Sequence, residues 1–332
     1  MTASATRPDP VELPGLPVPM SRLVLGTMTF GDTVDEAGAG RILDLALEAG
    51  VNAVDTANGY AGGASEEIVG RLLAARRPEV VLATKAGIPH PDAEGHAPLS
   101  AAGLRASLEG SLRRLGVERV DLFYLHQPDR ATPLAETLGT VAELVAEGKV
   151  GALAVSNYAA WQIAELNHAA DAAGAPRPVV AQQLYNLLAR RIEEEYTEFA
   201  AATGLLTMVY NPLAGGLLTG RHHFGRAPSS GRFGDSRIAA MYRERYWDAA
   251  LFDATAQLAR VADEAGLSLT DLSLRWLLGR PATGALLLGG SRPEHLSANL
   301  AAAAAGPLPP DVAQACDAVG ASLRGPMPAY NR

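Results

Sequence analysis

The chain has 332 residues, a formal net charge of −8 and a 48% share of hydrophobic residues. This balance is typical of a globular protein with a large core, and it argues against nucleic acid or an anionic membrane as the main partner. The longest apolar runs reach about ten residues, short of the ~20 that a membrane helix needs. A single cysteine, Cys316, excludes an internal disulfide framework and a cysteine-only metal site.

We expect that this protein is not exported. Residues 1–20 are rich in proline and lack the basic start and apolar core of a secretory leader. We therefore expect a cytoplasmic protein. No break in composition divides the chain, so we expect residues 1–332 to form a single domain.

Short apolar, β-branched runs alternate with segments of helical periodicity. The runs predict eight strands, at residues 23–26, 51–55, 80–85, 121–126, 151–157, 179–185, 205–210 and 285–289. The helical segments include one that ends at Gly50, one that begins at Ser65, and those at residues 104–115, 159–173 and 192–203.

Eight strands, each followed by a helix, predict an α/β fold of the (β/α)8 TIM-barrel type. A doubly wound open sheet is the alternative, but it normally has a Gly-x-Gly-x-x-Gly turn after its first strand. Here the first strand ends in Gly26-Thr27-Met28, which does not fit that turn. Residues 217–246, after the seventh strand, and residues 308–332 fall outside the regular alternation. Long loops of this kind usually shape the substrate pocket.

In a barrel, the active site lies at the C-terminal ends of the strands. Polar residues and glycines close most of the predicted strands: Asp55, Lys85, His126, Ser156, Asn157, Gln182, Tyr210, Gly289, Gly290 and Ser291. A single polar residue of this kind can be explained by ordinary solvation of a strand end. Seven such strand ends together indicate a site.

Three ionisable residues at the strand ends stand out, and a fourth, Tyr60, lies in the loop after Asp55. Lys85 is one of only two lysines and ends an apolar run, where an unpaired ammonium is costly, and Asp55 can supply its partner. Tyr60 lies five residues after Asp55. We expect Lys85 to lower the pKa of the Tyr60 phenol from its usual value of about 10. His126 can donate to a substrate carbonyl or share the phenol's proton. A buried ion pair beside a core histidine remains the structural alternative.

Other chemistries have little support. The seven histidines include His222 and His223, but no H-x-x-x-H or mixed ligand cluster shares a helix face, so we predict no metal. Gly-x-Ser-x-Gly is absent, and we place Cys316 in the core of a C-terminal helix. Residues 286–296 predict a strand, a glycine turn and a helix that starts at Pro293, where Ser291 and Arg292 favour a phosphate ligand.

These segments, in this order, resemble the aldo-keto reductase superfamily over essentially the whole chain. The resemblance lies in residues 55–60 with 63–67, 83–85, 121–129, 155–158, 182–186 and 210–220. Within the superfamily, residues 156–161, 231–233, 242–247 and 330–332 are similar to the aflatoxin aldehyde reductase group, which includes succinic semialdehyde reductases.

The resemblance implies carbonyl reduction with NADPH/NADP+, bound in extended form without a Rossmann fold. Tyr60 would be the general acid, tuned by Lys85 and Asp55, and His126 would orient the carbonyl. The implied cofactor-binding residues are Asp55, Ser156, Asn157, Gln182, Tyr210, Asn211, Leu213, Gly215, Arg221, Arg232, Gly289, Ser291, Arg292, His295 and Asn299. The family often has a glutamine and a glutamate where this chain has His295 and Ala298. The NADPH preference therefore rests mostly on Arg292, and NADH stays open.

Tyr242 and Arg245 are three residues apart in a predicted helix and so share a face. The resemblance implies that these two, with His126 and Arg332, bind the substrate, which suggests a carboxylate-bearing aldehyde. Solvated surface arginines are the alternative. A nucleotide-binding regulatory barrel like the potassium-channel β subunits is the second functional hypothesis. A homo-oligomer is left open.

Overall fold

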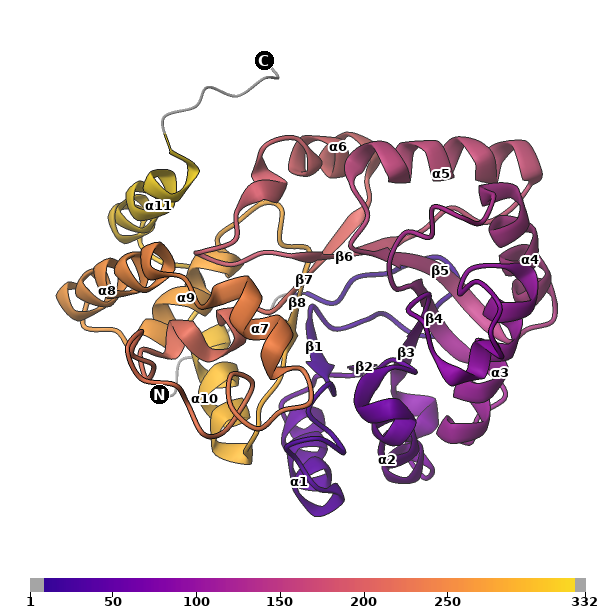
Figure 1. Ribbon diagram of the computed structural model, residues 1–332, viewed down its shortest axis with the longest axis horizontal. Helices are drawn as coiled ribbons and strands as arrows, with labels where there is room; N and C mark the ends of the chain where they lie inside the picture. The colour runs from indigo at the N-terminus through magenta and orange to yellow at the C-terminus, as the bar shows by residue number, and fades with distance from the viewer. Residues whose placement is uncertain (1–8, 326–332) are drawn as a thin grey trace.

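The computed structural model describes residues 9–325 and shows eight parallel strands in a closed barrel with helices around it (Figure 1). Each strand pairs with the next in chain order, and β8 pairs with β1. The predicted (β/α)8 barrel is thus confirmed, and the open sheet is excluded. The strands are β1 (Leu23–Gly26), β2 (Ala53–Asp55), β3 (Val81–Ala86), β4 (Val120–Leu125), β5 (Val150–Ser156), β6 (Val180–Leu184), β7 (Leu206–Tyr210) and β8 (Ala285–Leu288).

Helices follow the strands and cover the outside of the barrel (Figure 1). They are α1 (Glu36–Glu48), α2 (Ala64–Leu73), α3 (Ala101–Leu115), α4 (Leu134–Ala146), α5 (Ala160–Ala173), α6 (Tyr196–Thr203), α7 (Ala239–Tyr246), α8 (Ala249–Glu264), α9 (Leu269–Leu278), α10 (Pro293–Ala304) and α11 (Pro310–Arg324). Short 3-10 turns are η1 (Tyr60–Gly63), η2 (Arg77–Glu79), η3 (Pro91–Ala93), η4 (Arg191–Glu193) and η5 (Ala214–Thr219). No helix within residues 9–325 has the length and apolar character needed to cross a membrane.

The predicted helix at residues 192–203 is wrong in its first turn. Residues 191–193 form the separate turn η4, and α6 begins only at Tyr196. The Glu193 carboxylate accepts hydrogen bonds from Arg190 and from the hydroxyl of Tyr185, which follows β6. These contacts hold residues 191–193 in a separate turn against the barrel, so the helix begins only after them.

Side chains that alternate along the strands divide the core into two layers. The inner layer fills the barrel and contains many small residues: Val24, Ala53, Val81, Ala83, Leu122, Tyr124, Ala152, Ala154, Val180, Met208 and Ala285. The outer layer packs the strands against the helices. Six inner residues lie two positions before a polar strand end, so the same alternation turns those polar side chains towards the barrel axis.

A short N-terminal hairpin closes the other end of the barrel. Val11 and Met20 pair across it, and Met20 is fully buried against the inner layer. Gly15, at the turn, has φ of +82°, and a Cβ there would lie 2.3 Å from the carbonyl oxygen of Gly151. The turn therefore requires glycine, and the hairpin seals the end opposite the polar residues.

The predicted long connection after β7 is present and includes η5 and α7. Its middle is attached to the loop after β1, two strands away around the barrel. Asp32, in the loop after β1, accepts hydrogen bonds from Ser236 Oγ (2.6 Å) and from the backbone N–H of Arg237 (3.3 Å). The connection therefore crosses from β7 to β1. Cys316 is fully buried in α11, as predicted.

Candidate active site

The four ionisable residues singled out in the sequence come together at one end of the barrel. Lys85 Nζ donates to the Asp55 carboxylate, to the Thr56 carbonyl at 2.8 Å and to Tyr60 Oη at 3.3 Å. Lys85 and Asp55 are both 0% exposed. The tyrosine reaches the lysine because η1 is the next element after β2 and turns back over the strand ends.

The Asp55 carboxylate is held on both oxygens. Lys85 bonds Oδ1, and Gln182 Nε2 bonds Oδ2 at 2.9 Å from the opposite side of the barrel. Burial raises the pKa of Asp55, and the Lys85 charge opposes this. Burial alone would lower the pKa of Lys85, but Asp55 and Tyr60 raise it above its ordinary value. Lys85 is therefore a buried cation that faces the phenol oxygen.

Lys85 acts to lower the pKa of Tyr60, as expected, but the net pKa of Tyr60 lies above its usual value. Burial raises the pKa of Tyr60 above its usual value, the Lys85 charge only partly offsets this, and the Asp55 charge adds to the rise. Tyr60 is thus a neutral phenol at neutral pH. Because its oxygen already accepts a hydrogen bond from Lys85, its own proton is free to be donated elsewhere.

His126 follows β4 and lies beside the tyrosine, with the ring centroids 6.0 Å apart and the planes at 78°. Burial, and then the Lys85 charge, lowers the pKa of His126 to about 3. The Nδ1 atom is buried and has no hydrogen-bond partner within residues 9–325. The ring is therefore neutral at physiological pH and carries one N–H, which can donate to a carbonyl oxygen.

A second group of polar side chains continues around the mouth. Ser156 Oγ donates to the Gln182 carbonyl (3.0 Å), and Asn157 Nδ2 donates to the His126 carbonyl (2.9 Å). Tyr210 Oη donates to Asn157 Oδ1 (2.7 Å). Asn157 has φ of +62°, a conformation that asparagine tolerates better than most residues. These amides and hydroxyls connect the ends of β4, β5, β6 and β7.

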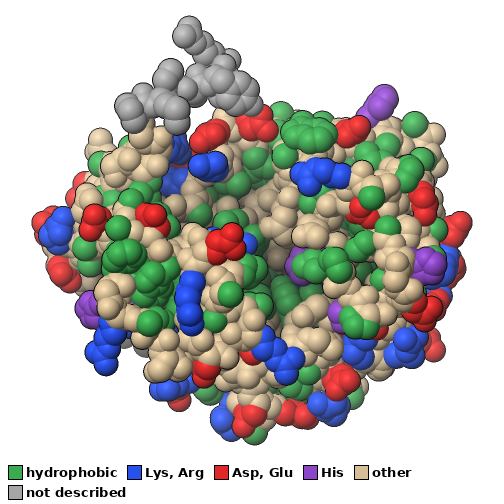
Figure 2. All heavy atoms as spheres, viewed as in Figure 1, with side chains coloured by type: hydrophobic (Ala, Val, Ile, Leu, Met, Phe, Trp, Pro, Cys, Tyr) green, Lys and Arg blue, Asp and Glu red, His purple; other side chains and the backbone are tan. Residues whose placement is uncertain are grey.

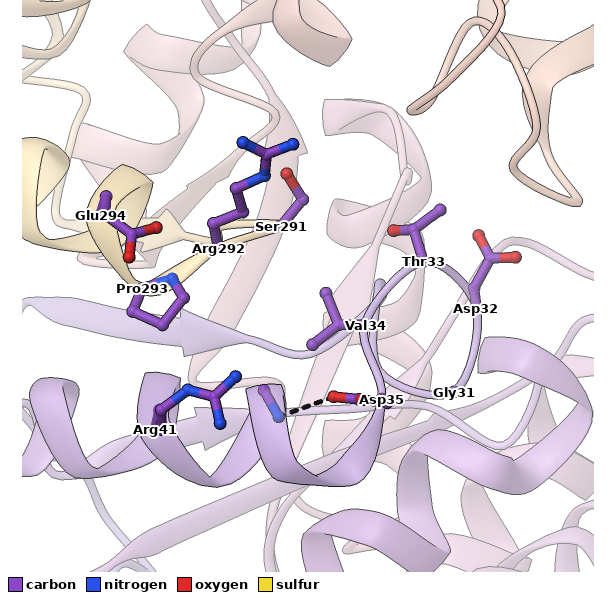
Figure 3. Close-up of a pocket in the computed structure, with 11 residues that line it drawn as sticks. Gly31, Asp32, Thr33, Val34, Asp35, Arg41, Ser291, Arg292, Pro293 and Glu294 are labelled. Carbon is purple, nitrogen blue, oxygen red and sulfur yellow. Dashed lines mark hydrogen bonds between the residues drawn. The ribbon is translucent and has the colours of Figure 1, made fainter.

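An open cavity of about 730 Å³ lies where the loop after β1 meets the start of α10 (Figure 3). Ser291 and Arg292 line it, and Pro293 begins α10 as predicted. Sequence reasoning missed Arg41, which lines the same cavity from α1 (Figure 3). Nothing near Arg41 in the sequence signals this, because α1 meets α10 only when β8 closes on β1.

Two further residues of the phosphate segment hold its shape. Asn299 is buried and donates to the Gly289 carbonyl at 3.1 Å, while His295 shares a hydrogen bond with Ser291 Oγ at 3.2 Å. A Cβ at Gly290 would lie 3.1 Å from the Arg292 carbonyl oxygen. Glycine therefore bares the backbone at this turn, which suits close approach by a phosphate.

The loop after β7 lies beside this phosphate segment. Asn211 Oδ1 accepts from the Gly215 N–H (2.7 Å), which folds the backbone through Leu213 into a tight turn. Arg221 lies beside Gly216, and Arg232 lies beside Gly289. No carboxylate within residues 9–325 pairs with Arg221, Arg232, Arg292 or Arg41. Exposed backbone N–H groups and guanidinium groups without a carboxylate partner together fit a pyrophosphate and a further phosphate.

The predicted substrate residues are only partly described. Tyr242 and Arg245 share a face of α7, with the guanidinium 5.8 Å from the tyrosine ring centroid. Tyr242 is buried against Gly215 and accepts a hydrogen bond from Arg232 (3.0 Å). Arg332 lies outside the described residues. Arg237, absent from the sequence predictions, is exposed beside the Ala61 carbonyl, one residue from Tyr60.

The site holds no set of metal ligands. Within residues 9–325, no group of three or more histidine, cysteine, aspartate or glutamate side chains could bind a metal ion. Figure 2 shows the face of the molecule hollowed near its centre. The site therefore contains a neutral phenol, a buried cation, a neutral imidazole and a group of residues that can bind phosphates.

Comparison with known proteins agrees with this geometry. The family model described as "Aldo/keto reductase family" matches residues 22–321. Aflatoxin B1 aldehyde reductase member 2 of Rattus norvegicus is 38% identical over 330 residues, covering 94% of this chain and 88% of the rat protein. A probable voltage-gated potassium channel subunit beta of Arabidopsis thaliana is 33% identical over 281 residues, covering 83% of this chain and 84% of the plant protein.

The structure of a glycerol dehydrogenase from Gluconobacter oxydans is also similar, with a TM-score of 0.78 and 28% identity, covering 98% of this chain and 99% of that chain. The sequence resemblance is thereby confirmed. The chain belongs to the aldo/keto reductase family and is an oxidoreductase that acts on carbonyl groups.

Proposed function

We propose that this protein reduces an aldehyde or ketone to an alcohol with NADPH, and that Tyr60 is the proton donor. One observation carries the proposal: the Tyr60 hydroxyl accepts a hydrogen bond from the fully buried ammonium of Lys85. A carbonyl that gains a hydride at carbon develops negative charge on oxygen, and that oxygen needs a proton. NADPH, when bound, supplies the hydride.

Each of the four residues has a distinct part in the proton step. Tyr60 holds its proton at neutral pH, since burial raises its pKa, and donates it to the carbonyl oxygen. The phenolate left behind is stabilised by Lys85. Asp55 keeps Lys85 charged and in place. His126, neutral at this pH, donates its N–H to the same oxygen and so orients the carbonyl.

The polar ring at the mouth fits a nicotinamide and its phosphates. Ser156, Asn157 and Gln182 offer amide and hydroxyl groups to a carboxamide, and Tyr210 offers a ring face for stacking. Asp55 lies beneath them. We assign the pyrophosphate to the turn formed by Asn211, Leu213 and Gly215 with Arg221 and Arg232. The adenosine end we assign to Gly289, Ser291, Arg292, His295 and Asn299, where the unpaired guanidinium of Arg292 favours the extra phosphate of NADPH.

The substrate end of the pocket is basic. Arg245 projects from α7 beside Tyr242. Burial raises the pKa of Tyr210 to about 12, and the nearby Arg245 charge opposes this rise. We propose that Arg245 binds a carboxylate on the aldehyde, with Tyr242 and Arg332 as further candidates. Chemically, this describes a short aldehyde with an acid group at its other end.

A regulatory barrel with little turnover is the second candidate, and the Arabidopsis relative named as a channel subunit supports it. The assembled Asp55, Tyr60, Lys85 and His126 favour turnover instead. An aldehyde panel assayed with NADPH and with NADH separates the two, because a binding module takes up the nucleotide without consuming it.

We predict that Tyr60→Phe lowers the reduction rate by ~10²–10⁴-fold, the usual cost of losing a positioned general acid. NADPH binding should not change, because the hydroxyl faces Lys85. Tyr196→Phe is the matched control, since Tyr196 is a buried tyrosine at the start of α6 whose hydroxyl shares a hydrogen bond with Thr207 of β7. A near-normal rate in Tyr60→Phe would refute the tyrosine mechanism.

Arg292→Ala should weaken NADPH far more than NADH. A charged hydrogen bond contributes roughly 1.5–3 kcal/mol, and NADH lacks the group that Arg292 would contact. Dissociation constants for the two cofactors, measured by quenching of tryptophan fluorescence, test this within one variant. Equal weakening of both cofactors would place the selectivity elsewhere on the cavity wall.

Arg245→Ala should raise the Michaelis constant for a carboxylate-bearing aldehyde about tenfold, equivalent to about 1.4 kcal/mol. The constant for a neutral aldehyde of similar size should hardly change, because it offers no anion to the guanidinium. Steady-state kinetics on the matched pair of substrates gives the comparison. The anion site would be ruled out by equal effects on both.

The neutral state of His126 makes stability depend on pH. Its pKa is about 3 in the folded chain and returns to about 6.5 on unfolding, so acid favours the unfolded state. The contribution is complete above pH ~6.5 and is lost as the pH falls towards 3. Between pH 7 and 5, wild type should lose up to about 2 kcal/mol more unfolding free energy than His126→Gln. Urea unfolding at both pH values measures this, and identical pH dependence in the two proteins would contradict it.

A further inference from the structure

A buried ionic network lies behind β3, the strand that carries Lys85, and outside the pocket. It centres on Arg114, in the last turn of α3. The Arg114 guanidinium donates from Nε to Glu66 Oε2 (2.8 Å) and from Nη1 and Nη2 to the two oxygens of Asp92 (3.0 and 2.6 Å). The side chains of Glu66, Asp92 and Arg114 are 0%, 13% and 17% exposed.

One arm of the network reaches the strand that carries Lys85. The other oxygen of Glu66 accepts a hydrogen bond from the hydroxyl of Thr84, which is fully buried. Thr84 directly precedes Lys85 in β3, so its side chain points outward where the lysine points into the barrel. A displacement of Glu66 is therefore transmitted to the backbone beside Lys85.

A second arm supports the turn that carries Tyr60. Gly63 closes η1, and a Cβ at this position would lie 2.8 Å from Arg114 Cδ, so the arginine stem packs directly against it. Ala61, Gly62 and Gly63 all have positive φ, between +50° and +99°. A turn of this kind lacks the regular bonding of a helix, and its position depends on what it packs against.

Buried charges of opposite sign hold this network together. Glu66 would be a fully buried charge without Arg114, which is strongly unfavourable. Burial acts to lower the pKa of Arg114, yet Asp92 and Glu66 raise it above its ordinary value. Gly110 in α3 leaves the space that the Asp92 carboxylate fills, since a Cβ there would lie 2.5 Å from a carboxylate oxygen. The fork of one arginine thus joins α3, α2 and the loop before α3.

We propose that Arg114 is a positioning residue for proton transfer: through Glu66 and Thr84 it sets the place of Lys85, and through Gly63 that of Tyr60. The 3.3 Å contact between Lys85 Nζ and Tyr60 Oη joins two segments that this one side chain supports. The inference rests on the proposed role of Tyr60 as proton donor. A network that only joined α2 to α3 would affect stability and leave the chemistry of each folded molecule unchanged.

Three variants of the full-length protein separate these roles. Arg114→Lys keeps the positive charge but cannot span Glu66 and Asp92 with one planar fork. Thr84→Val is close in shape and removes only the hydroxyl that links Glu66 to β3. Arg105→Lys is the matched control, because Arg105 lies on the same helix and pairs with Glu143 and Glu147 at the protein surface.

The measurement is the single-turnover rate of aldehyde reduction, followed by loss of nicotinamide absorbance and expressed per NADPH-binding site. We expect Arg114→Lys to slow this rate at least tenfold and Thr84→Val at least threefold. The NADPH dissociation constant and the half-saturating aldehyde concentration should stay within twofold, and Arg105→Lys should match wild type. If Arg114→Lys does not fold, Thr84→Val decides alone.

Wild-type rates per binding site in Arg114→Lys and Thr84→Val, with only the melting temperature lowered, would overturn the positioning role. Tyr60→Phe, run in the same assay, distinguishes this from failure of the proposed function. If Tyr60→Phe keeps its rate, the tyrosine mechanism fails whatever the Arg114 result. If Tyr60→Phe is inactive and Arg114→Lys is normal, only the positioning inference fails.

Discussion

The ammonium of Lys85, buried inside the barrel, is the constraint on which the rest of the site depends. A charge with no exposure needs a counter-charge and hydrogen bonds at fixed positions, and breaking such a pair costs about 3–5 kcal/mol. Asp55 can supply them only when β2 and β3 pair in the observed register, with Asp55 opposite Ala83. The same requirement draws Gln182 and Tyr60 towards the pair. Fold and site are therefore stabilised by one interaction.

Burial also decides the chemistry of the phenol. A lysine beside a tyrosine suggests a phenolate, but removal from water outweighs the attraction and keeps Tyr60 protonated. The Lys85 charge and its hydrogen bond offset only part of this rise in the pKa of Tyr60. A site organised in this way favours donation of a proton to a substrate, and the neutral imidazole of His126 adds a second donor without a second charge.

The barrel by itself does not specify an activity, because relatives named as reductases and as a channel subunit share it. The chemistry of this chain lies at the mouth of the barrel. The connection after β7 carries Arg221, Arg232 and Arg245, and Asp32 joins that connection to the loop after β1. Behind the strands, Arg114 joins two helices to the same segments. The connection after β7 thus covers the mouth of the pocket, and the Arg114 contacts support the strands on their outer side.

The sequence by itself determined the strand number, the barrel and the four ionisable residues. Alternation of apolar residues and the polar strand ends are local patterns, and parallel strands bring their C-terminal ends to one rim. The beginning of α6 escaped prediction because contacts between Glu193 and residues from other elements end the helix there.

Tertiary structure alone decided the rest. Arg41 joins the Arg292 cavity only because β8 closes on β1, and Arg114 reaches Glu66 only because α2 packs on α3. The direction of the Tyr60 pKa depends on how much water the fold removes from the hydroxyl. Contacts between segments far apart in the chain, and the depth at which a charge is buried, leave no local pattern in a single sequence.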